Sequence, residues 1–187
     1  MSYGEFSGNP RAEWLTEPGE DRRMQLLEDF WYLDPDGRKW LSPRNSIVDG
    51  ASIPAALWSV IGSPYTGEYR RASIVHDVAC DTPGLPRRDA DKMFYFACLA
   101  GGCSIRQARV LYAGVRIGAW APHIRLWTES MTLPATRKGA IRLTITDESV
   151  QNTFREIAAD MAQIPEDVPF EAVERVVDQH LQAKANQ

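Results

Sequence analysis

The sequence predicts an α+β fold: a small antiparallel β-sheet at the N-terminal side, a mainly helical core with an antiparallel helix hairpin, and further C-terminal helices. Two observations favour this class. Short aromatic and aliphatic runs separated by turn residues occupy the first quarter of the chain, as in a sheet of short strands. From residue 68 onward, apolar residues recur at helical spacing and are interrupted by proline and glycine.

The predicted sheet uses three segments. Residues 1–22 look irregular, and Met24–Leu33 then forms a strand rich in aromatic and aliphatic side chains. Asp34–Gly37 is a strong turn, because proline fixes its φ angle and glycine accepts a positive one. Arg38–Leu41 can therefore pair back as a hairpin, and Ser46–Val48 follows as a short strand.

The rest of the chain is mainly helical. Pro54 suits the first turn of a short helix over residues 55–61, which Ser52 could cap. Ser104 is a similar cap for a later helix. The longer predicted helices span residues 68–80, 87–100, 104–121, 148–164 and 170–181, and one further strand spans 141–145.

We divide the chain into a His/Asp-containing core domain over residues 1–127 and a strand and helical appendage over residues 128–187. The two last helices each have one apolar face. Such helices suit either docking to a partner or packing as a lid.

The composition limits the classes of function. Of the 187 residues, 44% are hydrophobic and 25% charged, so a normal core is expected. Lysine and arginine number 21 and aspartate and glutamate 25, and the formal net charge of -4 argues against a nucleic-acid partner held by a general positive field. Arginines gather in the central third, which suits either solvated helix faces or a local surface for an anion or a lipid.

The three cysteines and the N-terminus indicate the cellular compartment in which the protein is expected. Cys80, Cys98 and Cys103 have neither the even count of a secreted disulfide framework nor a C-x-x-C spacing. Met1–Pro10 lacks the apolar core of a signal peptide. No run approaches the roughly 20 apolar residues of a transmembrane segment. We therefore expect a cytoplasmic protein, unless a dedicated machine exports it.

A His/Asp pair is the main candidate site. If residues 68–80 and 87–100 fold back as an antiparallel hairpin, His76 lies level with Asp91. A carboxylate on one ring nitrogen fixes the tautomer of a histidine and steadies the imidazolium, while the other nitrogen takes a proton from water or a hydroxyl. His76 is thus a candidate general base, and Asp91 is the residue that would orient it.

Asp77 is a candidate metal ligand. It points about 100° round the helix from His76. Calcium would need further oxygens there, which the loop Gly62–Gly67 could supply. A plainer interpretation is an ion pair between Asp77 and Arg70 or Arg71.

Two more interpretations stay open. Arg87 and Asp91 are spaced i, i+4 and could simply pair along their helix, with His76 a satisfied core histidine. Cys80 lies one turn after His76, so a Cys/His pair is conceivable. A nucleophilic cysteine needs a base at hydrogen-bond distance, and an i, i+4 pair is usually structural.

A set of short motifs runs through the middle of the chain: Asp49–Pro54, Leu57-Trp58, Tyr69, Ala72, His76-Asp77, Arg87, Ala90-Asp91 and Phe94. In combination they resemble the domain of unknown function 1353 family of phages, prophages and bacteria. The resemblance covers roughly residues 6–120. It implies a phage or prophage context and assigns no activity. We take Asp49, Tyr69 and Arg87, which belong to these motifs, as supporting residues of the site.

The helix pair is also similar to that of phospholipases of the A2 type. This similarity implies that His76 activates water, Asp91 orients His76, and Asp77 binds a calcium ion that stabilises the oxyanion of an ester carbonyl. The disulfide cysteines that brace the helices of those enzymes have no counterparts here, and their glycine-rich calcium loop is not recognisable.

We therefore predict a phage- or prophage-derived hydrolase, phospholipase A2-like, with calcium as candidate cofactor and a lipid or another ester as substrate. The alternative is a non-enzymatic phage structural or accessory protein. It would be a tail or assembly component, or a binder that inhibits a host protein, with the C-terminal helices as the docking element. A third prediction is an exported antibacterial effector, and association with the virion belongs to the phage context.

Overall fold

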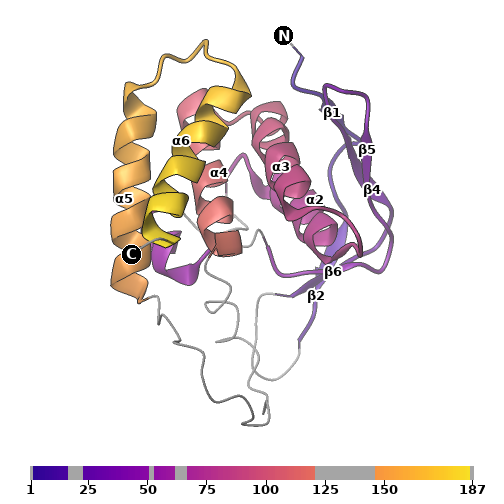
Figure 1. Ribbon diagram of the computed structural model, residues 1–187. Helices are drawn as coiled ribbons and strands as arrows, with labels where there is room; N and C mark the ends of the chain where they lie inside the picture. The colour runs from indigo at the N-terminus through magenta and orange to yellow at the C-terminus, as the bar shows by residue number, and fades with distance from the viewer. Residues whose placement is uncertain (1, 17–22, 51–52, 62–66, 121–145, 186–187) are drawn as a thin grey trace.

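The computed structural model describes residues 2–16, 23–50, 53–61, 67–120 and 146–185. Within these ranges the strands come first along the chain and the longer helices follow, so the predicted α+β class is confirmed. Figure 1 shows the strands gathered on one side of the molecule and most of the helices on the other.

The strands form two antiparallel sheets of three strands each, instead of the single sheet that was predicted. The first sheet contains, in spatial order, β1 (Glu5–Phe6), β4 (Phe30–Leu33) and β5 (Lys39–Ser42). The second contains β2 (Ala12–Trp14), β3 (Met24–Leu26) and β6 (Ile47–Val48).

Two strand predictions were wrong. Residues 1–22 contribute β1 and β2, whose two and three residues are too short for an alternating pattern to be recognised. The predicted strand Met24–Leu33 is divided into β3 and β4, which belong to different sheets. The break comes where the Leu27 N–H donates to the carbonyl of Arg11 and the Asp29 carboxylate accepts the N–H of Arg44.

The predicted hairpin is confirmed by the pairing of β4 with β5. The turn between them is held by Asp34, whose Oδ1 accepts the backbone N–H groups of Asp36 at 3.0 Å and Arg38 at 2.8 Å. Gly37 has a φ of 81°, a conformation that glycine adopts without strain. Along β5 the side chains of Trp40 and Ser42 are buried and their neighbours are exposed.

The helices follow the predicted order. The short helix begins as the 3₁₀ turn η1 (Ala55–Leu57) and continues as α1 (Trp58–Ile61). Ser104 caps as predicted, since its Oγ accepts the N–H of Gln107. The longer helices are α2 (Arg70–Asp81), α3 (Arg87–Gly101), α4 (Ile105–Trp120), α5 (Asp147–Gln163) and α6 (Phe170–Ala185). The predicted cap Ser52 and the predicted strand over 141–145 lie outside the described residues.

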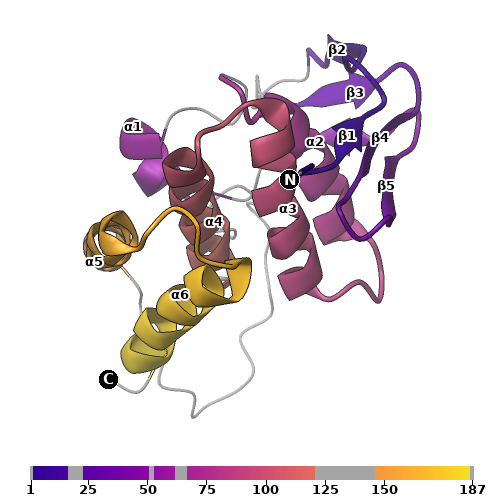
Figure 2. The same cartoon turned by 90° about the horizontal axis from the view of Figure 1, so that it is seen from above.

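The elements pack in layers from the sheets to the C-terminal helices. α2 contacts β4, β5 and β6 on one side and α3 on the other, and α3 in turn contacts α4. α5 and α6 pack against α4 and against each other, as the view from above shows in Figure 2. This order places α2 and α3 in the middle, where their facing side chains are shielded by other elements.

Arg109 ties the α5–α6 connection to α4. Its side chain is 1% exposed, and it donates to the carbonyls of Ile164 at 2.8 Å and Pro165 at 2.6 Å. These carbonyls follow the end of α5, where no helical N–H is left to bond them. Phe170, at the start of α6, packs against the rings of Tyr95 and Tyr112. Both C-terminal helices thus share the core of α4; the predicted boundary at 127/128 lies outside the described residues.

None of the helices in the described ranges has the length and apolar character needed to cross a lipid bilayer.

Candidate functional site

The predicted contact between His76 and Asp91 is present at the centre of the helix pair. The ring Nε2 of His76 in α2 lies 2.8 Å from Oδ1 of Asp91 in α3. Both side chains are 0% exposed. The His76 ring also packs against the ring of Phe94, with 4.8 Å between the centroids. The helix hairpin therefore holds an imidazole and a carboxylate in direct contact inside the core.

Two arginines form ion pairs with the buried carboxylate of Asp91. Nε of Arg87 lies 3.0 Å from Oδ1, and Nη1 of Arg116 in α4 lies 3.2 Å from Oδ2. Burial by itself raises the pKa of Asp91, but the His76 hydrogen bond and the charges of His76, Arg87 and Arg116 outweigh burial and lower the pKa below its ordinary value. The carboxylate is therefore ionised at neutral pH, and the Nε2–H of His76 donates to it.

Cys80 completes a compact group with this pair. Its Sγ lies 3.7 Å from Nδ1 and 3.5 Å from Nε2 of His76, one helical turn away in α2. Cys80 is half-buried, whereas the other two side chains are fully buried. One ligand atom from each of the three residues lies within 4.8 Å of the others, so the group could also hold a metal ion. Thiolate and imidazole ligands suit a transition metal better than calcium.

Asp77 lies in a different environment. Its Oδ2 accepts the backbone N–H of Asp49 at 2.7 Å, and its side chain is 5% exposed. Burial, together with the charge of Asp49, raises the pKa of Asp77 to about 8, even though its hydrogen bonds to the backbone of Asp49 and Gly50 oppose the shift. Asp77 thus anchors the Asp49-Gly50 backbone to α2, and its predicted role as a calcium ligand stays a prediction.

The supporting residues take three different places. Arg87 contacts Asp91 directly, in the predicted i, i+4 pair. Asp49 contributes its backbone N–H to Asp77, while its side chain is exposed. Tyr69 is buried where α2 begins, and its carbonyl accepts the N–H of Ser73. Tyr69 therefore belongs to the start of the helix, about two turns before His76.

Sequence reasoning missed the role of Arg116. The arginine-rich central third includes this residue, but its place beside Asp91 depends on how α4 packs against α3. Arg116 also extends the group to the C-terminal end, because its Nη2 lies 3.2 Å from Oδ1 of Asp178 in α6. No periodicity in the sequence predicts this long-range contact.

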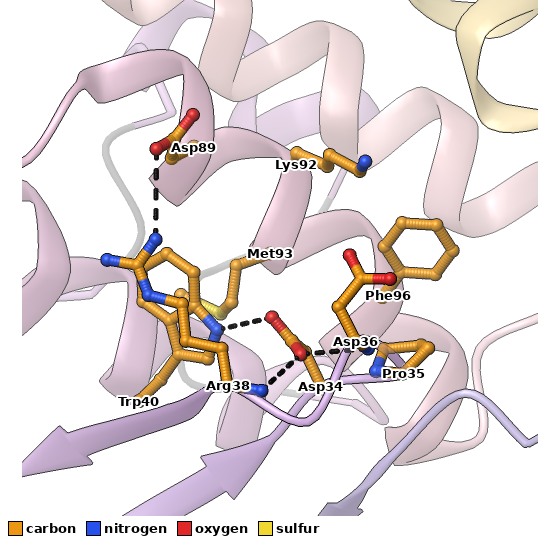
Figure 3. Close-up of a pocket in the computed structure, with 9 residues that line it drawn as sticks. All are labelled: Asp34, Pro35, Asp36, Arg38, Trp40, Asp89, Lys92, Met93 and Phe96. Carbon is orange, nitrogen blue, oxygen red and sulfur yellow. Dashed lines mark hydrogen bonds and ion pairs between the residues drawn. The ribbon is translucent and has the colours of Figure 1, made fainter.

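A surface pocket lies on another face of α3, beside the β4–β5 hairpin (Figure 3). Met93 and Phe96 from α3 line it together with Trp40. On its rim the Arg38 guanidinium stacks over the Trp40 ring at 4.0 Å and lies 3.8 Å from the Asp89 carboxylate. Arg38, Asp89 and Trp40 are thus engaged with one another, and Asp91 is not among the residues that line the pocket.

The comparisons with known proteins concern the central part of the chain. Residues 24–115 match the family model described as "Protein of unknown function (DUF1353)". The chain is 37% identical over 114 residues to the "Uncharacterized protein y4jT" of Sinorhizobium fredii (strain NBRC 101917 / NGR234), covering 60% of this chain and 33% of that protein. It is 35% identical over 98 residues to the "Uncharacterized protein y4iH" of the same strain, covering 52% and 41%.

The matched part of the chain therefore spans less than half the length of either relative. No solved structure matches the chain. These comparisons give no support to the similarity with phospholipases of the A2 type, which stays a prediction.

Proposed function

Residues 24–115 are a domain of the DUF1353 family, and from this premise we propose that the chain is a hydrolase of carboxylic esters with His76 as its general base. The observation that carries the proposal is the 2.8 Å contact between His76 Nε2 and Asp91 Oδ1. With Nε2 donating to Asp91, the lone pair of Nδ1 is the position that takes a proton during the reaction. Asp91 stabilises the imidazolium that results.

The surroundings of Asp91 support this role. Arg87 and Arg116 lower the pKa of the carboxyl, so it stays ionised while His76 gains and loses a proton. The pair also lies on two packed helices, which fix the orientation of the ring. A lipid or another ester is the proposed substrate class.

Calcium is the least supported part of the predicted mechanism. The Asp77 carboxylate is buried, and its Oδ2 already accepts the backbone N–H of Asp49. Ester hydrolysis measured with added calcium and with a calcium chelator tests that part separately.

Hydrolysis of p-nitrophenyl esters of increasing chain length, and of phospholipid vesicles, tests the proposal. In His76→Gln, which keeps most of the side-chain volume, we expect the rate to fall by about 10²–10⁴-fold. The matched control is His180→Gln, because His180 Nε2 makes a similar 2.8 Å contact with Asp160 at the surface between α5 and α6. Equal rates in the wild type and in a folded His76→Gln protein would reject the general base.

A second candidate function has its own support. His76 and Asp91 are 0% exposed, and the charges around Asp91 join α3, α4 and α6. A non-enzymatic phage or prophage protein, whether a tail or assembly component or a binder that inhibits a host protein, would use such a group only to hold its helices together. In that case His76→Gln changes thermal stability, and the wild type hydrolyses none of the esters above background.

A further inference from the structure

We propose that Cys80 is the nucleophile of this site, so that ester hydrolysis passes through an acyl group bonded to the thiol. This inference rests on the proposed hydrolase function and deepens it, because it names the attacking atom. The alternative within the same function is a water molecule activated by His76.

The three side chains form one compact group with the residue types that covalent catalysis uses. Cys80 Sγ lies 3.7 Å from Nδ1 and 3.5 Å from Nε2 of His76, and the same Nε2 lies 2.8 Å from Asp91 Oδ1. This sequence of thiol, imidazole and carboxylate has the logic of a nucleophile, its base, and the group that orients the base. The Sγ–Nδ1 distance is longer than a working hydrogen bond, as is often found before a substrate binds.

Exposure also favours the thiol. The His76 ring has no exposed surface, so a substrate at the protein surface needs an intermediary to reach the base. Cys80 is half-buried and lies in direct contact with that ring. Of the three side chains, Cys80 is therefore the one that an ester carbonyl can approach.

The proposed reaction has two steps. First, the Cys80 thiol transfers its proton to Nδ1 of His76, Sγ bonds to the carbonyl carbon, and the ester C–O bond breaks, so that the alcohol leaves with that proton. Second, a water molecule attacks the thioester while His76 takes one of its protons. The carboxylic acid is then released and the proton returns to Sγ, so no oxidant, reductant or metal is required.

The other two cysteines provide controls within the chain. Cys98 is 0% exposed and Cys103 6%, and both lie at the end of α3, away from His76. Burial raises the pKa of the Cys98 thiol well above its ordinary value, whereas the hydrogen bond with Cys98 lowers the pKa of Cys103, which is shielded from reagents by its burial. Alkylation of the folded protein should therefore occur at Cys80 first, and peptide mass spectrometry distinguishes the three positions.

Alkylation by iodoacetamide at pH 7 tests the thiol without any substrate. A thiolate stabilised by an adjacent imidazolium reacts faster than an ordinary thiol, so His76→Asn should slow the labelling of Cys80 by about tenfold. The control His180→Asn should label as the wild type does. Equal rates in wild type and His76→Asn would overturn the proposal, as would a wild type in which Cys80 stays unlabelled.

Activity and trapping separate this proposal from the proposed function. With an active ester, Cys80→Ala should lose at least about 10²-fold in rate, whereas Cys103→Ala should keep the wild-type rate. Rapid acid quench should reveal an acyl group on the Cys80 peptide. If Cys80→Ala keeps its rate while His76→Gln loses it, water is the nucleophile and only this inference fails. If both keep the wild-type rate, the proposed function fails as well.

Metal analysis of the purified protein tests the remaining alternative, in which Cys80 is a metal ligand. A stoichiometric zinc ion, lost in Cys80→Ala and kept in Cys103→Ala, would make the thiol a ligand and overturn its role as nucleophile. A protein free of transition metal that still shows rapid Cys80 labelling supports the proposal.

Discussion

Arg116 in α4 contacts Asp91 in α3, with Nη1 of the arginine 3.2 Å from Oδ2 of the carboxylate. The other end of the same guanidinium reaches Asp178 in α6 at 3.2 Å. The carboxylate that orients His76 is therefore connected, through one arginine, to the last helix of the chain. Changes at this group should alter both the site and the folding of the C-terminal helices.

Neutralising Asp91 should strongly destabilise the protein. In Asp91→Asn, Arg87 and Arg116 would lose a buried counter-charge, and breaking such a pair costs about 3–5 kcal/mol of unfolding free energy. Urea unfolding followed by circular dichroism measures the difference. The control is Asp160→Asn, whose partner His180 lies at the surface, with an expected change below about 1 kcal/mol. Equal losses in the two variants would contradict this account of Asp91.

Asp77 should make the protein less stable as the pH rises. Its pKa is raised to about 8 in the folded state, so above the ordinary pKa of 3.8 the unfolded chain loses the proton while the folded chain keeps it. The free energy of unfolding therefore falls between about pH 4 and pH 8, by at most about 1.4 kcal/mol per pH unit from this group. Melting temperatures from pH 5 to pH 8 should show a shallower decline in Asp77→Asn than in the wild type.

Asp91 should act in the opposite direction. Its pKa is lowered in the folded state, so it contributes stability above its ordinary pKa and loses that contribution as the pH falls through the folded value. The two effects occupy different pH windows. If the melting temperature falls above pH 5 as steeply in Asp77→Asn as in the wild type, a group other than Asp77 causes that fall.

Replacing Arg109 should loosen the α5–α6 connection. Arg109→Met keeps the length of the side chain but leaves the carbonyls of Ile164 and Pro165 without their donor, at a cost of about 2–5 kcal/mol. Arg106→Met on the same helix is the control, because Arg106 pairs with Glu166 at the surface and should contribute less than about 1 kcal/mol. Chemical denaturation compares the two variants. Similar unfolding midpoints would show that the Arg109 hydrogen bonds do not stabilise the α5–α6 connection.

Gly101 should not tolerate a side chain. A Cβ atom there would lie 2.5 Å from the carbonyl oxygen of Glu68, so the end of α3 and the segment before α2 would have to separate. Gly101→Ala should lower stability by about 1–3 kcal/mol, as expected for overpacking. Ala100→Ser at the neighbouring half-buried position is the control in a thermal melt. A melting temperature for Gly101→Ala equal to that of the wild type would show that the backbone at Glu68 moves away from residue 101 at little cost in stability.

The helix pair could be predicted because its signals are local. The Pro-Gly break and the helical spacing define two helices of known length, and counting outward from the break pairs His76 with Asp91, as found. The i, i+4 pair of Arg87 with Asp91 follows from the same geometry. The resemblance to the family was likewise read from short motifs, and it is confirmed over residues 24–115.

The missed features depend on contacts between distant segments. β1 pairs with β4 across a long interval of chain, and the few residues of β1 and β2 carry no recognisable pattern. Arg116 reaches Asp91 only because α4 packs against α3. The hydrogen bond of Asp77 depends on where the Asp49-Gly50 backbone passes, and the sequence alone did not predict this contact.

The segment that matches the family ends at residue 115, one position before the arginine that bridges α3 to α6. A shortened chain that stops there would keep the histidine and its acid but forfeit half of the acid's charge compensation. The C-terminal helix therefore contributes, through Asp178 and Arg116, to the charge balance of a carboxylate that lies two helices away.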